Sequence, residues 1–156
     1  QVKPNYTEAI FLLSQIQVNN GQIKDAIIST QFAIQTNPNN SLLHFQLGLL
    51  QYNDKNYQGA VDALQNAIKI NDQYANARYF LGLAYARLGK YSDAIIQFEN
   101  LAASNPDNKE VLTILTNLKS GKSPFNDILP PSDSRPEKRS TLPVKEKATT
   151  SKKTLN

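Results

Sequence analysis

Apolar and small side chains recur at helical spacing along most of this chain, and the pattern is clearest over residues 75–106. Gly82 and Tyr85 lie three positions apart on one predicted helix, and Ala94 and Phe98 lie four positions apart on the next. Spacings of three and four place side chains on one face of an α-helix, which has about 3.6 residues per turn. The stretch therefore predicts two amphipathic helices joined by a tight turn.

The same pattern occurs three times, with a period of 34 residues. Gly82 aligns with Gly48 and then with Ser14. Small residues at equivalent places let two helices approach closely where they cross, while larger side chains fill the space around the crossing. Such self-similarity predicts a stack of helical hairpins. The predicted helices cover residues 7–19, 23–36, 41–53, 57–70, 75–88 and 91–104.

The turn inside each hairpin falls at Gly21, Lys55 and Gly89. Glycine adopts a left-handed backbone conformation easily, because it has no Cβ to clash with the chain. Any other residue is strained there by about 1 kcal/mol. If Lys55 is left-handed like its two counterparts, the second hairpin therefore carries that cost.

A seventh helix is predicted over residues 109–119, with Val111, Ile114 and Leu118 among the members of its apolar stripe. A repeat stack leaves the apolar edge of its last repeat in water unless another element covers it. We interpret this segment as a capping helix that stops near Gly121. The alternative is a truncated fourth repeat that offers a face to a partner.

The composition changes after Lys122, where five of the eight prolines occur and no period can be traced. Such a sequence buries too little apolar surface to offset its ordering entropy, so we predict a disordered tail. Phe125, Ile128 and Leu129 form an apolar island that we expect to dock near the capping helix. The predicted boundaries are 1–6 for a leading segment, 7–40, 41–74 and 75–108 for three repeats, 109–120 for the capping helix and 121–156 for the tail.

These units resemble the tetratricopeptide repeat (TPR) family, whose characteristic positions are best kept in the third unit. The other units depart from the family pattern, with Gln17 and Gln51 where Tyr is usual and Asp72 where Pro is usual. The resemblance covers about residues 7–106. It implies an all-α, right-handed superhelical solenoid of three hairpins, followed by the capping helix and the tail. Because the family fold serves many tasks, function has to be argued from a site. The matching positions of the third unit are Leu81, Gly82, Tyr85, Ala94, Phe98 and Pro106.

In this family, positions 2, 5, 9, 12 and 13 of each first helix line the concave surface. The resemblance therefore implies a groove with an apolar floor and an amide-rich border. Such a groove suits a peptide segment or helix of a protein partner, or of the same polypeptide. The alternative is that the aromatic residues at position 5, which are Phe11, Phe45 and Tyr79, only pack neighbouring repeats together. The predicted groove residues are Phe11, Gln15, Val18, Asn19, Leu42, Phe45, Leu49, Tyr52, Asn53, Asn76, Tyr79, Leu83 and Arg87.

Some members of the family bind the free acidic C-termini of chaperones through cations and asparagines at five positions. None of the residues at the equivalent positions here is a cation, so the charge-assisted contacts to two carboxylates are missing. We therefore predict no binding of that kind. The equivalent residues are Phe11, Gln15, Gln46, Asn76 and Phe80.

The net charge of +4 lies entirely in the tail. Residues 1–121 hold nine basic and nine acidic side chains, whereas residues 122–156 hold eight and four. The basic residues of the tail are mixed with acids and prolines and have no interleaved aromatics, so attraction to a polyanion would be weak and salt-sensitive. We expect no nucleic-acid partner, and membrane contact only through a parent protein.

The sequence contains no recognisable catalytic constellation. His44 is the single histidine and there is no cysteine, so neither a zinc site nor an activated nucleophile can be assembled in a familiar way. The six glycines fall at predicted turns, crossings or helix ends rather than in a phosphate-binding loop. We therefore expect no enzyme, no cofactor and no metal, and we interpret His44 as a packed side chain.

The chain contains no methionine, so we expect a processed product or a piece of a longer protein. Residues 117–125 are similar to the C-termini of bacterial multi-spanning membrane proteins that resemble O-antigen ligases or polymerases. On this alternative the domain is a soluble appendage that organises a glycan-assembly complex. No apolar run approaches the roughly 18 residues of a membrane span. We expect a soluble domain, cytoplasmic or membrane-associated through its parent chain, and the sequence leaves the compartment open.

Overall fold

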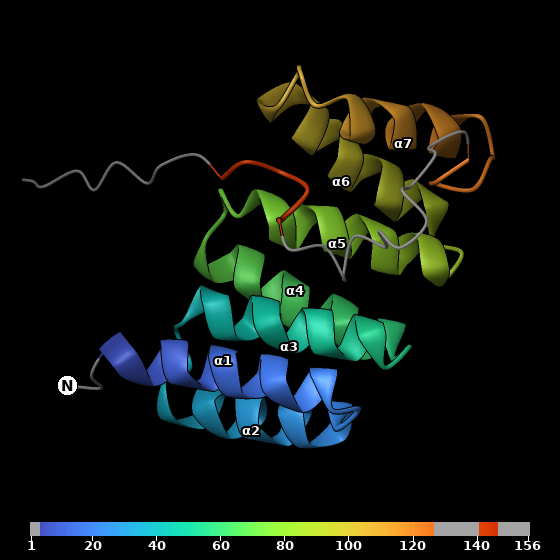
Figure 1. Cartoon of the computed structure of the whole chain (residues 1–156). Helices are drawn as coiled ribbons and strands as arrows, with labels where there is room; N and C mark the ends of the chain where they lie inside the picture. The colour runs from blue at the N-terminus through green and yellow to red at the C-terminus, as the bar shows by residue number, and fades with distance from the viewer. Residues whose placement is uncertain (1–3, 127–140, 147–156) are drawn as a thin grey trace, which may run out of the picture.

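The computed structural model describes residues 4–126 and 141–146, which contain seven α-helices and no strand. The first hairpin packs on the second, the second packs on the third, and the last helix packs on the third hairpin (Figure 1). The predicted all-α solenoid of three hairpins and a C-terminal helix is confirmed. The helices are α1 (Pro4–Asn19), α2 (Ile23–Thr36), α3 (Ser41–Asn53), α4 (Tyr57–Ile70), α5 (Ala75–Arg87), α6 (Tyr91–Ser104) and α7 (Lys109–Lys119).

Five of the seven helices begin and end where the sequence predicts, and α5 ends one residue early, at Arg87. The start of α1 differs more, because the helix begins at Pro4 and not at Thr7. Our prediction that residues 1–6 precede the first helix was therefore wrong for residues 4–6. Proline fits the first turn of a helix, where its missing N–H has no intrahelical partner to lose and its fixed φ is already helical.

Glycines mark the closest approach of the two helices in the second and third hairpins. A Cβ placed on Gly48 would lie 2.5 Å from Leu64 Cγ, and one on Gly82 would lie 2.6 Å from Phe98 Cε2. Contacts this short leave no room for a methyl group. The predicted role of both glycines at helix crossings is therefore confirmed. At the equivalent place in the first hairpin, Ser14 is buried and accepts a hydrogen bond from the Gln46 side chain of α3.

The main hydrophobic core runs from α3 to α7, and a smaller cluster joins the first hairpin to α3. Three members of the predicted stripe on α7, Val111, Ile114 and Leu118, are buried in the main core. This burial agrees with a capping role for α7. The first hairpin is less enclosed, since Leu12 and Phe32 remain more than half exposed. No helix in the described ranges has both the length and the apolar character to cross a membrane.

Lys55 has a φ of 62°, close to the 77° of Gly21 and the 72° of Gly89 at equivalent turns. Lys55→Gly is therefore expected to raise the free energy of unfolding by about 1 kcal/mol. The midpoint of thermal unfolding should rise by about 4 °C, which circular dichroism can measure. Lys55→Ala, which keeps the Cβ, is the matched control. An equal gain from the alanine variant would mean that the lysine side chain, and not the backbone, carries the cost.

Candidate functional site

The structure separates the predicted groove residues by their burial. The backbone of Phe11 belongs to α1, while its side chain lies outside the part of the molecule that the structure describes. The remaining residues fall into three groups. Gln15, Asn19, Leu42 and Arg87 are exposed; Val18, Leu49 and Asn53 are half-buried; Phe45, Tyr52, Asn76, Tyr79 and Leu83 are buried.

Two of the aromatic residues at position 5 lie in the core between repeats. The ring of Phe45 is centred 4.8 Å from that of Tyr74 and 6.0 Å from that of Phe80. The ring of Tyr79 is centred 5.3 Å from that of Phe80 and 5.5 Å from that of Phe98. Both aromatics are at most 2% exposed. Packing between neighbouring repeats, the alternative that the sequence left open, is therefore observed for Phe45, whose partner Phe80 belongs to the third repeat. Both ring partners of Tyr79 belong to its own repeat.

A segment of the tail, residues 141–146, lies against the N-terminal end of α5 (Figure 1, red). Val144 is 2% exposed, and the Asn76 side chain pairs with its backbone in both directions. Asn76 Nδ2 donates to the Val144 carbonyl at 2.7 Å, and Asn76 Oδ1 accepts from the Val144 N–H at 3.0 Å. Asn108, at the start of α7, donates through Nδ2 to the Pro143 carbonyl at 3.0 Å. The predicted groove residue Asn76 thus binds the protein's own tail.

The Glu146 carboxylate binds the first free amides of α5. It accepts hydrogen bonds from the backbone N–H of Ala75 at 2.9 Å and of Asn76 at 2.8 Å, and from Asn76 Nδ2 at 2.6 Å. The N-terminus of a helix favours a negative group, because its first amides lack intrahelical partners and its dipole is positive there. Burial, followed by the nearby charge of Glu146, raises the pKa of the Tyr74 phenol above its ordinary value.

A second tail contact lies at the other end of α7. Phe125 is half-buried against the main core. The Asn117 side chain donates through Nδ2 to the carbonyls of Pro124 at 3.0 Å and Asn126 at 2.5 Å. Docking of the apolar island near the capping helix is confirmed for Phe125. Ile128 and Leu129, the rest of that island, lie outside the described residues.

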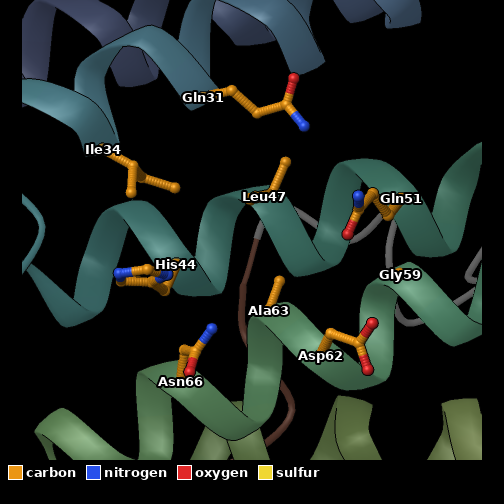
Figure 2. A pocket seen from close by; sticks show the side chains of 9 residues that line it. All are labelled: Gln31, Ile34, His44, Leu47, Gln51, Gly59, Asp62, Ala63 and Asn66. Atoms are coloured by element: carbon orange, nitrogen blue, oxygen red, sulfur yellow. The ribbon is translucent and has the colours of Figure 1, made fainter.

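A hollow of about 220 Å³ lies between α2, α3 and α4 (Figure 2). His44, Leu47 and Gln51 of α3 contribute to it, and these positions face away from the predicted groove residues of the same helix. His44 is 9% exposed, and its Nε2 donates to the Pro38 carbonyl at 2.8 Å. This ring is packed and hydrogen-bonded to a turn, as the sequence suggested. Amide side chains and Asp62 also line the hollow, which brings no nucleophile and base into contact.

Comparisons with known proteins agree with the repeated helical hairpins of the structure. Two family models described as tetratricopeptide repeat match residues 11–76 and 51–118. No curated protein matches. MamA has a similar solved structure, with a TM-score of 0.68 and 28% identity over 76% of this chain and 70% of that one.

Two further structures carry peptides. The first TPR of Spaghetti (RPAP3), bound to the HSP90 peptide SRMEEVD, has a TM-score of 0.71 and 19% identity over 77% of this chain and 95% of that one. The second TPR domain of human RPAP3, in complex with the HSP70 peptide SGPTIEEVD, has a TM-score of 0.68 and 24% identity over 75% and 98%. Together, the repeated hairpins, the glycines at their crossings and the two matching models show that this chain belongs to the tetratricopeptide repeat family.

Proposed function

We propose that this domain is a non-catalytic protein-interaction scaffold that binds an extended polypeptide segment. The binding site that we propose lies where α5 and α7 begin, on the face that carries the predicted groove residues. One observation carries the proposal: Asn76 and Asn108 already hold the backbone of Pro143 and Val144. A surface that pairs with the backbone of one segment of this chain has the chemistry to pair with another.

The contacts explain how such a site would bind a peptide without any catalytic group. An asparagine side chain offers both a donor and an acceptor. Asn76 can therefore replace the hydrogen bonds to water that a peptide backbone loses when it binds. The free amides at the start of α5 add a preference for a carboxylate. Gln15, Asn19 and Arg87, which were predicted for the polar border of the groove, are exposed toward the C-terminal ends of α1 and α5. Peptides bound by RPAP3 domains of the same fold support this kind of partner.

Peptides ending in the acidic chaperone motif are expected to bind poorly. Of the five positions that hold such tails in some relatives, Gln46 is 4% exposed and Phe80 is fully buried, and none carries a positive charge. Titration of a labelled SRMEEVD peptide should give no saturable binding at micromolar concentration. A micromolar affinity that disappears when salt is added would contradict this prediction.

The proposed function can be tested by selecting peptides that bind the whole chain and mapping where they bind. Twelve-residue sequences would be selected from a random display library, and one of them titrated into isotope-labelled protein. We expect the backbone amide shifts to change along α1, α3, α5 and α7. Asn76→Ala should weaken binding at least about tenfold through the lost hydrogen bonds, whereas Asn66→Ala, on the exposed side of α4, should leave it unchanged. Shift changes confined to α2, α4 and α6, or a failure to select any peptide, would contradict the proposal.

A further inference from the structure

The contacts that the tail segment makes at the proposed site are more specific than the burial of an apolar side chain alone. Val144 is 2% exposed, whereas Leu142, two residues before it, is 49% exposed. Both backbone groups of Val144 pair with one side chain, and the carbonyl of the preceding proline pairs with Asn108. A buried side chain whose own N–H and C=O are both paired with the receptor is a typical way in which a peptide segment is recognised.

The helix end that receives Glu146 lacks the cap that its counterparts have. Asn40 and Asn108 precede α3 and α7 and cap them with their own side chains. Tyr74 lies midway between them, 34 residues from each, and forms no capping hydrogen bond. The amides of Ala75 and Asn76 are therefore available to a carboxylate from elsewhere, and Glu146 supplies it from 71 residues away.

The side chain of Lys145, which lies between the anchoring residues Val144 and Glu146, is not recognised by the site. This side chain is exposed and borders a hollow of about 170 Å³ between the N-terminal end of α5 and the C-terminal end of α6. The observed contacts thus recognise three features of the bound segment: a backbone that pairs with Asn76, a buried aliphatic side chain, and a carboxylate two positions after it.

Resting on the proposed function, we propose that residues 143–146 are an exchangeable internal ligand of this site. A partner segment with an aliphatic residue followed two positions later by Asp or Glu takes their place when it binds. An internal ligand that belongs to the same chain as its site acts at an effective concentration on the order of millimolar. The tail therefore sets a threshold that only a stronger or more abundant partner segment exceeds.

The test compares peptide binding by the full chain with and without its docked tail. The probe is a fluorescein-labelled peptide with the sequence of residues 141–147, followed by fluorescence anisotropy. The released variant carries Val144→Ser with Glu146→Gln, which removes the buried side chain and the charge without touching the repeats. We expect the probe to bind the released variant at least about tenfold more tightly than the wild type. Circular dichroism checks that the helices are intact.

Two matched variants examine the specificity. Leu142→Ser with Lys145→Gln alters the exposed residues of the same segment and should keep the wild-type affinity. In the released variant, a probe with Gln in place of the residue equivalent to Glu146 should bind at least about tenfold more weakly. Adding Tyr74→Asn, which restores the cap present at Asn40 and Asn108, should reduce that discrimination to about threefold or less.

The outcomes separate this inference from the proposed function. Equal affinity of the probe for the wild type and the released variant would overturn the inference, because the tail would not compete. The same holds if selected peptides bind along α1, α3 and α5 while residues 143–146 stay docked, although the scaffold function would then survive. If neither the probe nor any selected peptide binds either protein, both proposals are wrong.

Discussion

Replacing Tyr79 by Ala is expected to lower the free energy of unfolding by about 3–5 kcal/mol, the usual cost of removing a buried aromatic ring. Tyr79 has no exposed surface and packs its ring against Phe80 and Phe98. Its hydroxyl also donates to the Glu110 carboxylate of α7. The ring therefore joins the third repeat to the capping helix. Urea unfolding followed by circular dichroism at 222 nm measures the loss.

Two further variants show how much of this loss comes from the burial of the Tyr79 ring and how much from its hydroxyl group. Tyr91→Ala makes the same change at a residue of α6 that is 53% exposed, and should cost at most about 0.5 kcal/mol. Tyr79→Phe keeps the ring and removes the hydroxyl group that donates to Glu110, with an expected loss of about 1–3 kcal/mol. If Tyr79→Ala cost no more than Tyr91→Ala, this residue would belong to an open groove instead of the core.

Gly82→Ala is expected to destabilise the third hairpin, although alanine is the better helix former. An added Cβ would lie 2.6 Å from Phe98 Cε2 and 2.9 Å from Phe98 Cδ2, and the Phe98 ring is fully buried among other core side chains. Overpacking of this kind costs about 1–3 kcal/mol. Alanine offsets about 1 kcal/mol of that cost by its helix propensity. The expected net loss is up to about 2 kcal/mol, measured by the same urea unfolding.

The steric origin of that loss can be checked by changing the ring that the new methyl group meets. Phe98→Leu will itself be destabilising, but it removes the ring atoms beside Gly82. In the Phe98→Leu background, Gly82→Ala should therefore cost clearly less than in the wild type, since residues in contact do not behave additively. Strictly additive losses would show that the glycine is required for a reason other than the close approach of α5 and α6.

Most of the fold could be predicted because the same physical requirement recurs at one spacing. Gly48 and Gly82 are 34 residues apart and meet Leu64 and Phe98 at equivalent crossings. One correct repeat therefore placed the others. The start of α1 was missed because it depends on the tolerance of the first helical turn for Pro4, which no periodic pattern carries.

The candidate site was only partly predictable. Family positions pointed to Asn76, whose side chain pairs with Val144 of the protein's own tail, but they could not tell that Phe45 and Tyr79 are buried in the core. Val144 and Glu146 lie about 70 residues away in sequence from the residues that they bind, so no local pattern could predict their docking. One signal was present and was missed: Tyr74 interrupts the series of capping asparagines at Asn40 and Asn108.

The central claim is that this face of the molecule binds an extended segment through its backbone, and the Val144 amide reports on it directly. Its N–H donates to the buried Asn76 side chain at 3.0 Å. Hydrogen exchange of that amide, measured by NMR in the full chain, should be at least about tenfold slower than in a free peptide with the sequence of residues 141–147. Exchange at the rate of the free peptide would contradict the account.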